Sequence, residues 1–183
     1  MQDQQVKQQT LAWIEAVVIG LNLCPFAKRE LDADKIHLVI SDSTTDAHLL
    51  VDLQTQLEFL LQSPDIETSL LVHPEVLTDF HQYNEFLSIA DSLLASLDLD
   101  GVIQIASFHP DYQFAETAPN DTSNYSNRSP YPMLHLLREN SVEQAVERYP
   151  DVNSIPERNI ALLQGMGKAE LDALLKACLL VSS

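Results

Sequence analysis

Apolar residues recur along the first part of the chain at two spacings that alternate. In QQTLAWIEAVVIGLNLCPF (residues 8–26), apolar positions three and four residues apart predict a helix that ends near Asn22. Two further stretches share this spacing and predict helices: 45–62 and 80–97. Three short apolar or β-branched runs lie between and after them and predict strands: 35–41, 67–73 and 101–108. The expected order is therefore helix, strand, helix, strand, helix, strand.

This order predicts an α/β fold. Strands separated by helices of such lengths imply crossover connections and a small, largely parallel sheet flanked by helices, here formed by residues 1–118. The pattern changes at residues 119–131, which are polar and lack glycine, so a long ordered loop or a lid is expected. Residues 132–183 are expected to form a helical segment that packs on the core within the same single domain.

Three features predict helices in this last segment. SPYPMLHLLREN can begin a helix with Pro132 in its first turn. SVEQ at 141–144 and SIPE at 154–157 both have the form of a helix-capping box. KAELDALLKACLL, residues 168–180, has helical apolar spacing and is expected to be the last helix.

Charge and composition exclude several classes of partner. The chain carries 27 Asp and Glu but only 10 Lys and Arg, and residues 36–127 contain no Lys or Arg at all. Nucleic-acid binding needs cations that neutralise phosphates, so it is not expected. No apolar run approaches the roughly 18 residues of a membrane helix, so no membrane partner is expected either. Cys24 and Cys178 lie far apart behind an N-terminus without a basic-then-apolar leader, which favours reduced thiols and the cytoplasm.

Two histidine–proline pairs stand where predicted strands end. His73 occurs in LLVHPEVLTDF, and His109 occurs in SFHPDYQF with Asp111 two residues beyond it. Ligands of open parallel sheets bind outside the carboxyl ends of the strands, so both histidines are expected at one rim. Each histidine–proline pair either merely ends its strand or forms part of a functional site. In a site, His109 would be the general acid or base, oriented by Asp111, with His73 as its partner.

The same groups match the ligands of a divalent metal. Two imidazoles and the Asp111 carboxylate could hold such an ion, with Asp42 or His135 completing the set. No recognised metal motif supports this reading, and His135 among apolar neighbours is equally typical of a packed core residue. The cofactor therefore stays open. The four glycines form neither a P-loop nor a dinucleotide fingerprint, so no nucleotide cofactor is expected.

Cys24 and Arg128 are the remaining candidates for chemistry. Cys24, just after the first helix and four residues before Lys28, is either a nucleophile with a stabilised thiolate or a small packed hydrophobe. Arg128 could grip a carboxylate or phosphate of a substrate, or it could pair with nearby acids or hold its loop. Tyr112 and Asn127 are the other candidate substrate-binding residues.

Four blocks of sequence carry a resemblance to a known family. GLNLCPFAKRE, SFHPDYQF, NRSPYPMLHLLRE and IPERN resemble domain-of-unknown-function family 1415, mainly bacterial proteins of similar length, over residues 11–163. The resemblance implies no activity. Two hypotheses stay open. One is a cytoplasmic enzyme that acts on a small polar or anionic metabolite at the strand ends through His/Asp or Cys chemistry. The other is a non-catalytic domain that binds a metal or a small ligand or docks to another protein.

Overall fold

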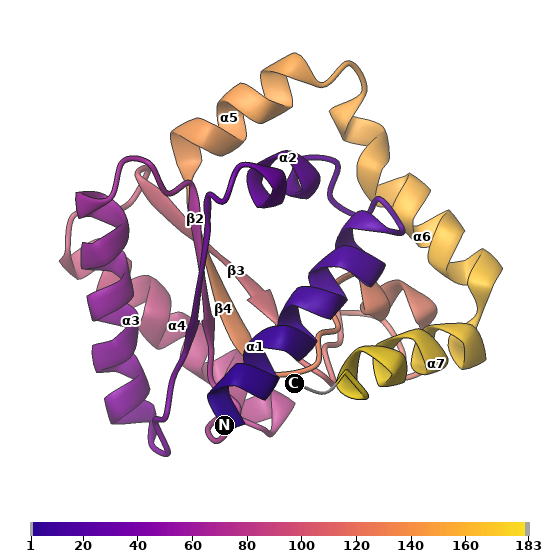
Figure 1. Ribbon diagram of the computed structural model, residues 1–183, viewed down its shortest axis with the longest axis horizontal. Coiled ribbons are helices and arrows are strands. Elements are labelled where there is room, and N and C mark those ends of the chain that lie inside the picture. Colours follow the sequence, from indigo (N-terminus) through magenta and orange to yellow (C-terminus); the bar gives the residue numbers. More distant parts are fainter. Residues whose placement is uncertain (1, 182–183) are drawn as a thin grey trace.

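A four-stranded sheet with helices on both faces forms the centre of the computed structural model, which describes residues 2–181 (Figure 1). In sequence order the strands are β1 (Ile36–Ile40), β2 (Thr68–Val72), β3 (Ile103–Phe108) and β4 (Met133–Arg138). Their order across the sheet is β1-β2-β4-β3, and β4 runs antiparallel to both of its neighbours. The other three strands share one direction, which confirms the α/β class and the three expected strands.

The helices confirm the expected alternation with the first three strands. The chain begins with α1 (Gln2–Trp13), the π-helical turn η1 (Ile14–Ile19) and the short α2 (Ala27–Asp32). Two long helices precede β2 and β3, namely α3 (Asp46–Gln62) and α4 (Phe80–Ser96). The remaining helical elements are η2 (Thr122–Ser126), α5 (Glu139–Arg148), η3 (Val152–Ser154), α6 (Ile155–Met166) and α7 (Lys168–Leu179).

The first helix widens before it ends at the expected place. The amide of Gly20 donates to the carbonyl oxygen of Glu15 at 2.9 Å, which is the five-residue spacing of a π-turn. A Cβ atom on Gly20 would lie 2.3 Å from the carbonyl oxygen of Ala16, so this turn requires glycine. Asn22 then adopts a φ of 53° and directs the chain out of the helix, as its tolerance of the left-handed region predicts.

The helix expected from Pro132 onward is wrong, because residues 133–138 form β4. A continuous apolar run such as MLHLLR is compatible with either a buried helix or a buried strand. Here it lies between β2 and β3, with His135 opposite Leu70 on one side and Ala106 on the other. The insertion satisfies the backbone groups along both neighbouring strands. The helical segment therefore begins at Glu139, seven residues later than expected.

The two capping boxes have different outcomes. Ser141 lies inside α5, which begins two residues earlier, and its hydroxyl donates to Glu67 instead of capping a helix. Ser154 does occupy the N-cap position of α6, with proline in the first turn. Its hydroxyl, however, donates to the Asp151 carbonyl oxygen at 2.9 Å. The polar segment 119–131 forms an ordered loop that includes η2, and the last helix lies where the spacing predicts it.

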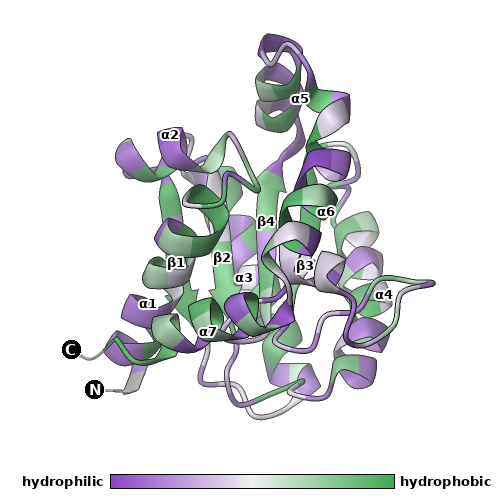
Figure 2. Cartoon of the chain, turned by 90° about the vertical axis from the view of Figure 1, so that its right-hand side faces the viewer, coloured by the Kyte–Doolittle hydropathy of each residue, from purple (hydrophilic) through white to green (hydrophobic). Residues whose placement is uncertain are grey.

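Two apolar clusters cover the two faces of the sheet. α3 and α4 pack on one face, where they bury the side chains of Leu71, Leu134 and Leu136. α1, η1 and α7 pack on the other face, where Leu70 and Met133 are buried (Figure 2). On this second face a cavity lies between α2, α5 and η1. Within residues 2–181, no helix combines the length and the apolar character needed to cross a membrane.

Tyr83 ties α4 to the ends of two strands. Its buried hydroxyl donates to the carbonyl oxygen of Met133 at 2.8 Å and accepts from the amide of Phe108 at 3.1 Å. One side chain thus satisfies a backbone acceptor at the start of β4 and a backbone donor at the end of β3.

We expect Tyr83→Phe to lower the free energy of unfolding by about 1 to 3 kcal/mol, because it leaves both backbone groups without this partner in the interior. Urea denaturation followed by circular dichroism would measure the change. Tyr112→Phe is the matched control, because within residues 2–181 the Tyr112 hydroxyl takes part only in a long contact with Ser107, at 3.4 Å. An equal loss in both variants would contradict the role assigned to Tyr83.

Candidate functional site

His73 and His109 lie at the same end of the sheet, although β4 separates their strands. Both rings face Tyr83, with ring centroids 5.9 Å and 5.1 Å from its own. Both histidines are nevertheless fully buried, with 0% of either side chain exposed. They therefore share a region beneath the surface and not an open rim.

Most ring nitrogens of these two histidines have hydrogen-bond partners within the fold. Nδ1 of His73 lies 2.9 Å from the carbonyl oxygen of Val76, and Nε2 of His109 lies 3.2 Å from that of Leu77. Nδ1 of His109 accepts from the backbone amide of Asp111, so the backbone and not the carboxylate of Asp111 orients the ring. Burial lowers the pKa of His73 to about 4 and also lowers that of His109, so both are neutral at pH 7. Acid–base catalysis by this group stays a prediction, and the contacts favour a structural role.

A divalent metal site at these histidines is not assembled. Across residues 2–181, no three His, Cys, Asp or Glu side chains come together as metal ligands. Asp42 is exposed after β1, and His135 lies in the middle of β4, where it bonds to Thr68. Asp42 and His135, which were expected to complete the metal site, therefore lie in other parts of the molecule.

Arg128, Tyr112 and Asn127 all lie in the loop between β3 and β4. The Arg128 guanidinium donates to the carbonyl oxygens of Tyr112 and Pro119, at 3.3 Å and 2.6 Å. It also lies 4.6 Å from the centre of the Tyr125 ring. The Asn127 amide donates to the Ser107 carbonyl oxygen at 3.0 Å. Substrate binding by these residues stays a prediction, while their contacts show that they hold the loop.

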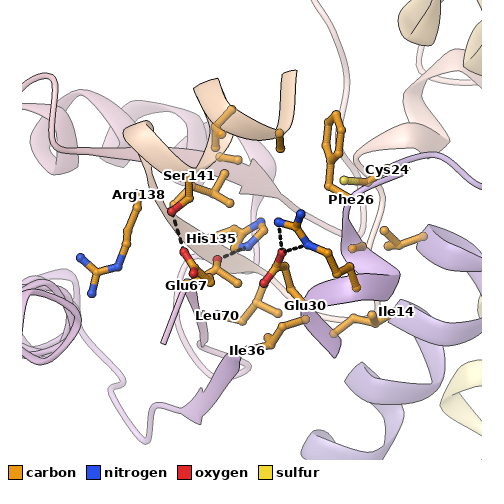
Figure 3. A pocket seen from close by; sticks show the side chains of 18 of the residues that line it. Ile14, Cys24, Phe26, Glu30, Ile36, Glu67, Leu70, His135, Arg138 and Ser141 are labelled. Carbon is orange, nitrogen blue, oxygen red and sulfur yellow. Dashed lines mark hydrogen bonds and ion pairs between the residues drawn. The ribbon is translucent and has the colours of Figure 1, made fainter. Parts of the chain in front are cut away.

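A cavity of about 310 Å³, here called the sheet cavity, lies on the sheet face opposite α3 and α4 (Figure 3). Its floor is formed by side chains of all four strands, and its walls come from η1, α2 and α5. Most of its lining is apolar, as in typical small-molecule sites. Representative lining residues are Ile14, Phe26, Leu70, Ala106, Phe108 and Val142.

His135 and Gln104 are polar residues on the floor of the sheet cavity, and the hydrogen bonds of His135 fix its tautomer. The Thr68 hydroxyl donates to the Leu136 carbonyl oxygen at 2.7 Å, so its own hydrogen bond with His135 must be accepted from Nε2–H. This arrangement assigns the proton to Nε2 and leaves Nδ1 as an acceptor, for which the described residues provide no partner. Burial lowers the pKa of His135 to about 4, so the ring is neutral at pH 7.

Charged residues at the edge of the sheet cavity are engaged with one another. Glu67 accepts from Ser141 at 2.5 Å and forms an ion pair with Lys35 at 3.1 Å. The hydrogen bond from Ser141, followed by the contacts with Lys35, lowers the pKa of Glu67 below its usual value. Arg29 and Glu30 form a second pair at the mouth (Figure 3). The charges at the rim are thus paired with one another, while His135 and Gln104 are the polar residues of the floor.

A second cavity of about 520 Å³, here called the loop cavity, lies between α6 and the loop after β3. Cys24 lines both cavities, and it is half-buried with a free thiol. Arg158 and Asn159 position its loop, because they donate to the carbonyl oxygens of Asn22 and Leu23 at 2.6 Å and 2.8 Å. The blocks GLNLCPFAKRE and IPERN, 136 residues apart, therefore meet beside this cysteine.

Three sequence-predicted candidates thus line a cavity. Cys24 lines both cavities, Asn127 lines the loop cavity, and His135, which the sequence places among packed core residues and optional metal ligands, lines the sheet cavity. Thr68 and Ser141 were not identified from the sequence as site residues. A weak signal for His135 exists, since it is the one polar position in the apolar run MLHLL. Its significance depends on the strand period, which places it on the cavity face beside Met133 and Leu137.

Comparison with known proteins adds a family without an activity. The family model described as "Protein of unknown function (DUF1415)" matches residues 5–173 of the 183 in the chain. No curated protein and no solved structure shows significant similarity to the chain.

The buried histidines predict a specific loss of stability in mild acid. A folded-state pKa below that of the unfolded chain means that only the unfolded state takes up the proton, so stability falls as the pH drops from about 6.5 towards 4. For His73 the loss between pH 7 and pH 5 is about 2 kcal/mol. Urea unfolding of wild type and His73→Gln at both pH values measures it. The exposed His81→Gln is the control. Identical pH dependence in wild type and His73→Gln would contradict the prediction.

The two roles of Arg128 can be separated by a conservative change. Lysine keeps the charge but cannot bridge the carbonyl oxygens of Tyr112 and Pro119, so we expect Arg128→Lys to destabilise the fold by about 1 to 2 kcal/mol. Thermal unfolding would show the shift. An unchanged melting temperature, combined with weaker binding of an anionic ligand, would instead establish a ligand-gripping role.

Proposed function

The chain belongs to the DUF1415 family, whose description states no activity, and from its own geometry we propose that it binds a small, neutral, mostly apolar molecule in the sheet cavity. The observation that supports this most directly is the Nδ1 atom of His135, an acceptor on the floor of a mostly apolar space for which the described residues provide no partner. Because protein atoms do not enclose Nδ1, a ligand that enters the cavity can donate a hydrogen bond to it in place of water.

The direction of that hydrogen bond limits the ligand. Because Nε2 of His135 carries the proton and donates to Thr68, Nδ1 can only accept. The ligand must therefore present a donor at this point, such as a hydroxyl or an amide N–H. A carboxylate offers only lone pairs and would face the Nδ1 lone pair, which is unfavourable.

Charge also favours a neutral ligand. The formal net charge of the chain is −17, and the carboxylates of Glu30 and Glu67 lie at the rim of the sheet cavity. An anion would be repelled on approach and would lose its hydration inside. A cation would find the carboxylates of Glu30 and Glu67 already paired with Arg29 and Lys35, and no carboxylate lies on the floor to compensate the loss of its hydration.

Ligand binding is the second of the two functions that the sequence leaves open. We prefer it to an enzyme of anionic metabolites because His73 and His109 are buried and Arg128 holds its own loop. A chemical role for Cys24 would use the same cavity and stays a prediction. Two free cysteines are compatible with the proposed cytoplasmic setting.

Three unbranched probes of similar length test the proposal: 1-octanol, its methyl ether and octanoate. We expect 1-octanol to bind about tenfold more tightly than either of the others, because it alone donates a hydrogen bond to Nδ1 without a charge. Isothermal titration calorimetry would measure the three affinities. His135→Leu should remove the difference between the alcohol and the ether.

Two controls distinguish binding in the sheet cavity from nonspecific binding. His37→Leu changes a histidine on the opposite face of the sheet, where it stacks on Phe59, and should keep the preference for the alcohol. Ala106→Leu narrows the sheet cavity and should weaken all neutral probes, whereas Ala161→Leu on the exposed face of α6 should not. Equal or tighter binding of octanoate would show that the proposed recognition is wrong.

A further inference from the structure

The sheet cavity and the loop cavity are neighbours that share part of their walls. Both are lined by Val18, Cys24 and Phe108. Three elements contribute this shared wall, namely η1, the loop after it and the carboxyl end of β3. The two spaces therefore adjoin at these three side chains.

Weak contacts hold this wall in place. The Cys24 thiol is free and makes no hydrogen bond within the described residues. The Phe108 ring is packed edge-on against Trp13, with centroids 5.3 Å apart, and lies 6.1 Å from the ring of His135. None of the three side chains in the wall is charged or anchored by a polar contact, so a change of rotamer there breaks no hydrogen bond.

Beyond the wall, the apolar lining continues. The loop cavity is bounded by Phe114 and by Ile155, Pro156 and Ile160 of α6, with hydroxyl and amide groups of the loop on its far side. Ile160 is 42% exposed, which places an apolar side chain where this cavity meets solvent. The path from His135 past Cys24 to Ile160 is thus polar at its inner end and apolar for most of its length.

The volumes of the two cavities also favour a ligand that occupies both of them. Sites for small molecules have volumes of about 300 to 1,000 Å³. The sheet cavity alone, at about 310 Å³, lies at the lower limit of this range. Joined to the loop cavity of about 520 Å³, it falls well inside the range and becomes elongated.

We propose that the ligand is a single-chain neutral lipid, whose hydroxyl or amide head donates to His135 and whose aliphatic chain passes Cys24 and Phe108 into the loop cavity. This inference rests on the proposed function of the sheet cavity and adds the length and shape of the ligand. A long chain displaces the side chains of the wall, and the head group keeps the same hydrogen bond for every chain length.

The test uses unbranched 1-alkanols from 1-hexanol to 1-tetradecanol, measured by displacement of a fluorescent apolar probe. With wild-type protein, affinity should rise by about three- to fourfold per added methylene, and this rise should continue beyond the length that fills the sheet cavity. In Ile160→Trp the rise should stop at a shorter chain, while the shortest alkanols bind as tightly as before. In Cys24→Trp the rise should also stop early, and the shortest alkanols should bind more weakly because Cys24 lines the sheet cavity as well.

Leu162→Trp is the matched control for Ile160→Trp. Leu162 lies on the same helix and is 37% exposed, but it lines neither cavity. This variant should behave like wild type at every chain length. Both α6 substitutions are at partly exposed positions, so they remain informative if Cys24→Trp fails to fold.

A second measurement uses the unchanged protein. Cys24 is half-buried and Cys178 is buried, so a maleimide should alkylate Cys24 first. We expect 1-tetradecanol to slow this alkylation at least tenfold and 1-hexanol, at equal occupancy, to leave it nearly unchanged. An affinity plateau at short chains in wild type, or equal protection by both alkanols, would overturn the elongated site and leave the proposed function intact. Failure of every alkanol to bind would refute both.

Discussion

The pairing of β4 with β2 on one side and β3 on the other is the interaction on which the rest of the molecule depends. Six residues of β4 satisfy the backbone groups of two strands that would otherwise present open edges inside the fold. The same residues contribute Leu134 and Leu136 to the core beneath α3 and α4. On its other face, β4 places His135 and Leu137 on the floor of the sheet cavity. One antiparallel insertion therefore completes the sheet, its core and its candidate site.

The long connection from β3 to β4 explains why so much polar sequence is ordered. Asn124 is fully buried and accepts from the Phe114 amide and the Thr117 hydroxyl, at 3.0 Å and 2.8 Å. Arg128 crosses the same loop to two carbonyl oxygens. The backbone of this loop has no regular hydrogen bonding. Hydrogen bonds from polar side chains fix it, as packing fixes other parts of the molecule. The loop in turn forms one side of the loop cavity.

The chemistry of the sheet cavity follows from a neutral histidine in an acidic protein. Abundant surface carboxylates favour protonation of histidines in general, but burial opposes it more strongly at His135 and lowers its pKa to about 4. The ring is consequently a hydrogen-bond acceptor of fixed tautomer. On the mostly apolar floor, this acceptor and the neighbouring Gln104 amide are the groups that can select a ligand by hydrogen bonding.

Local pattern in the sequence determined the elements whose apolar period has one interpretation: the two long amphipathic helices, the last helix, the first three strands and the end of the first helix at Asn22. It also placed Cys24 outside a regular element and excluded phosphate-binding glycine loops. It did not determine MLHLLR, because a short continuous apolar run has no period, and only the backbone groups of β2 and β3 made it a strand. Nor could it show that His73 and His109 are buried while His135 meets a cavity, because a cavity arises where helices leave part of a sheet face uncovered. That coverage is set by how α1, α2 and α5 pack, so the tertiary structure alone decided which residues form the site.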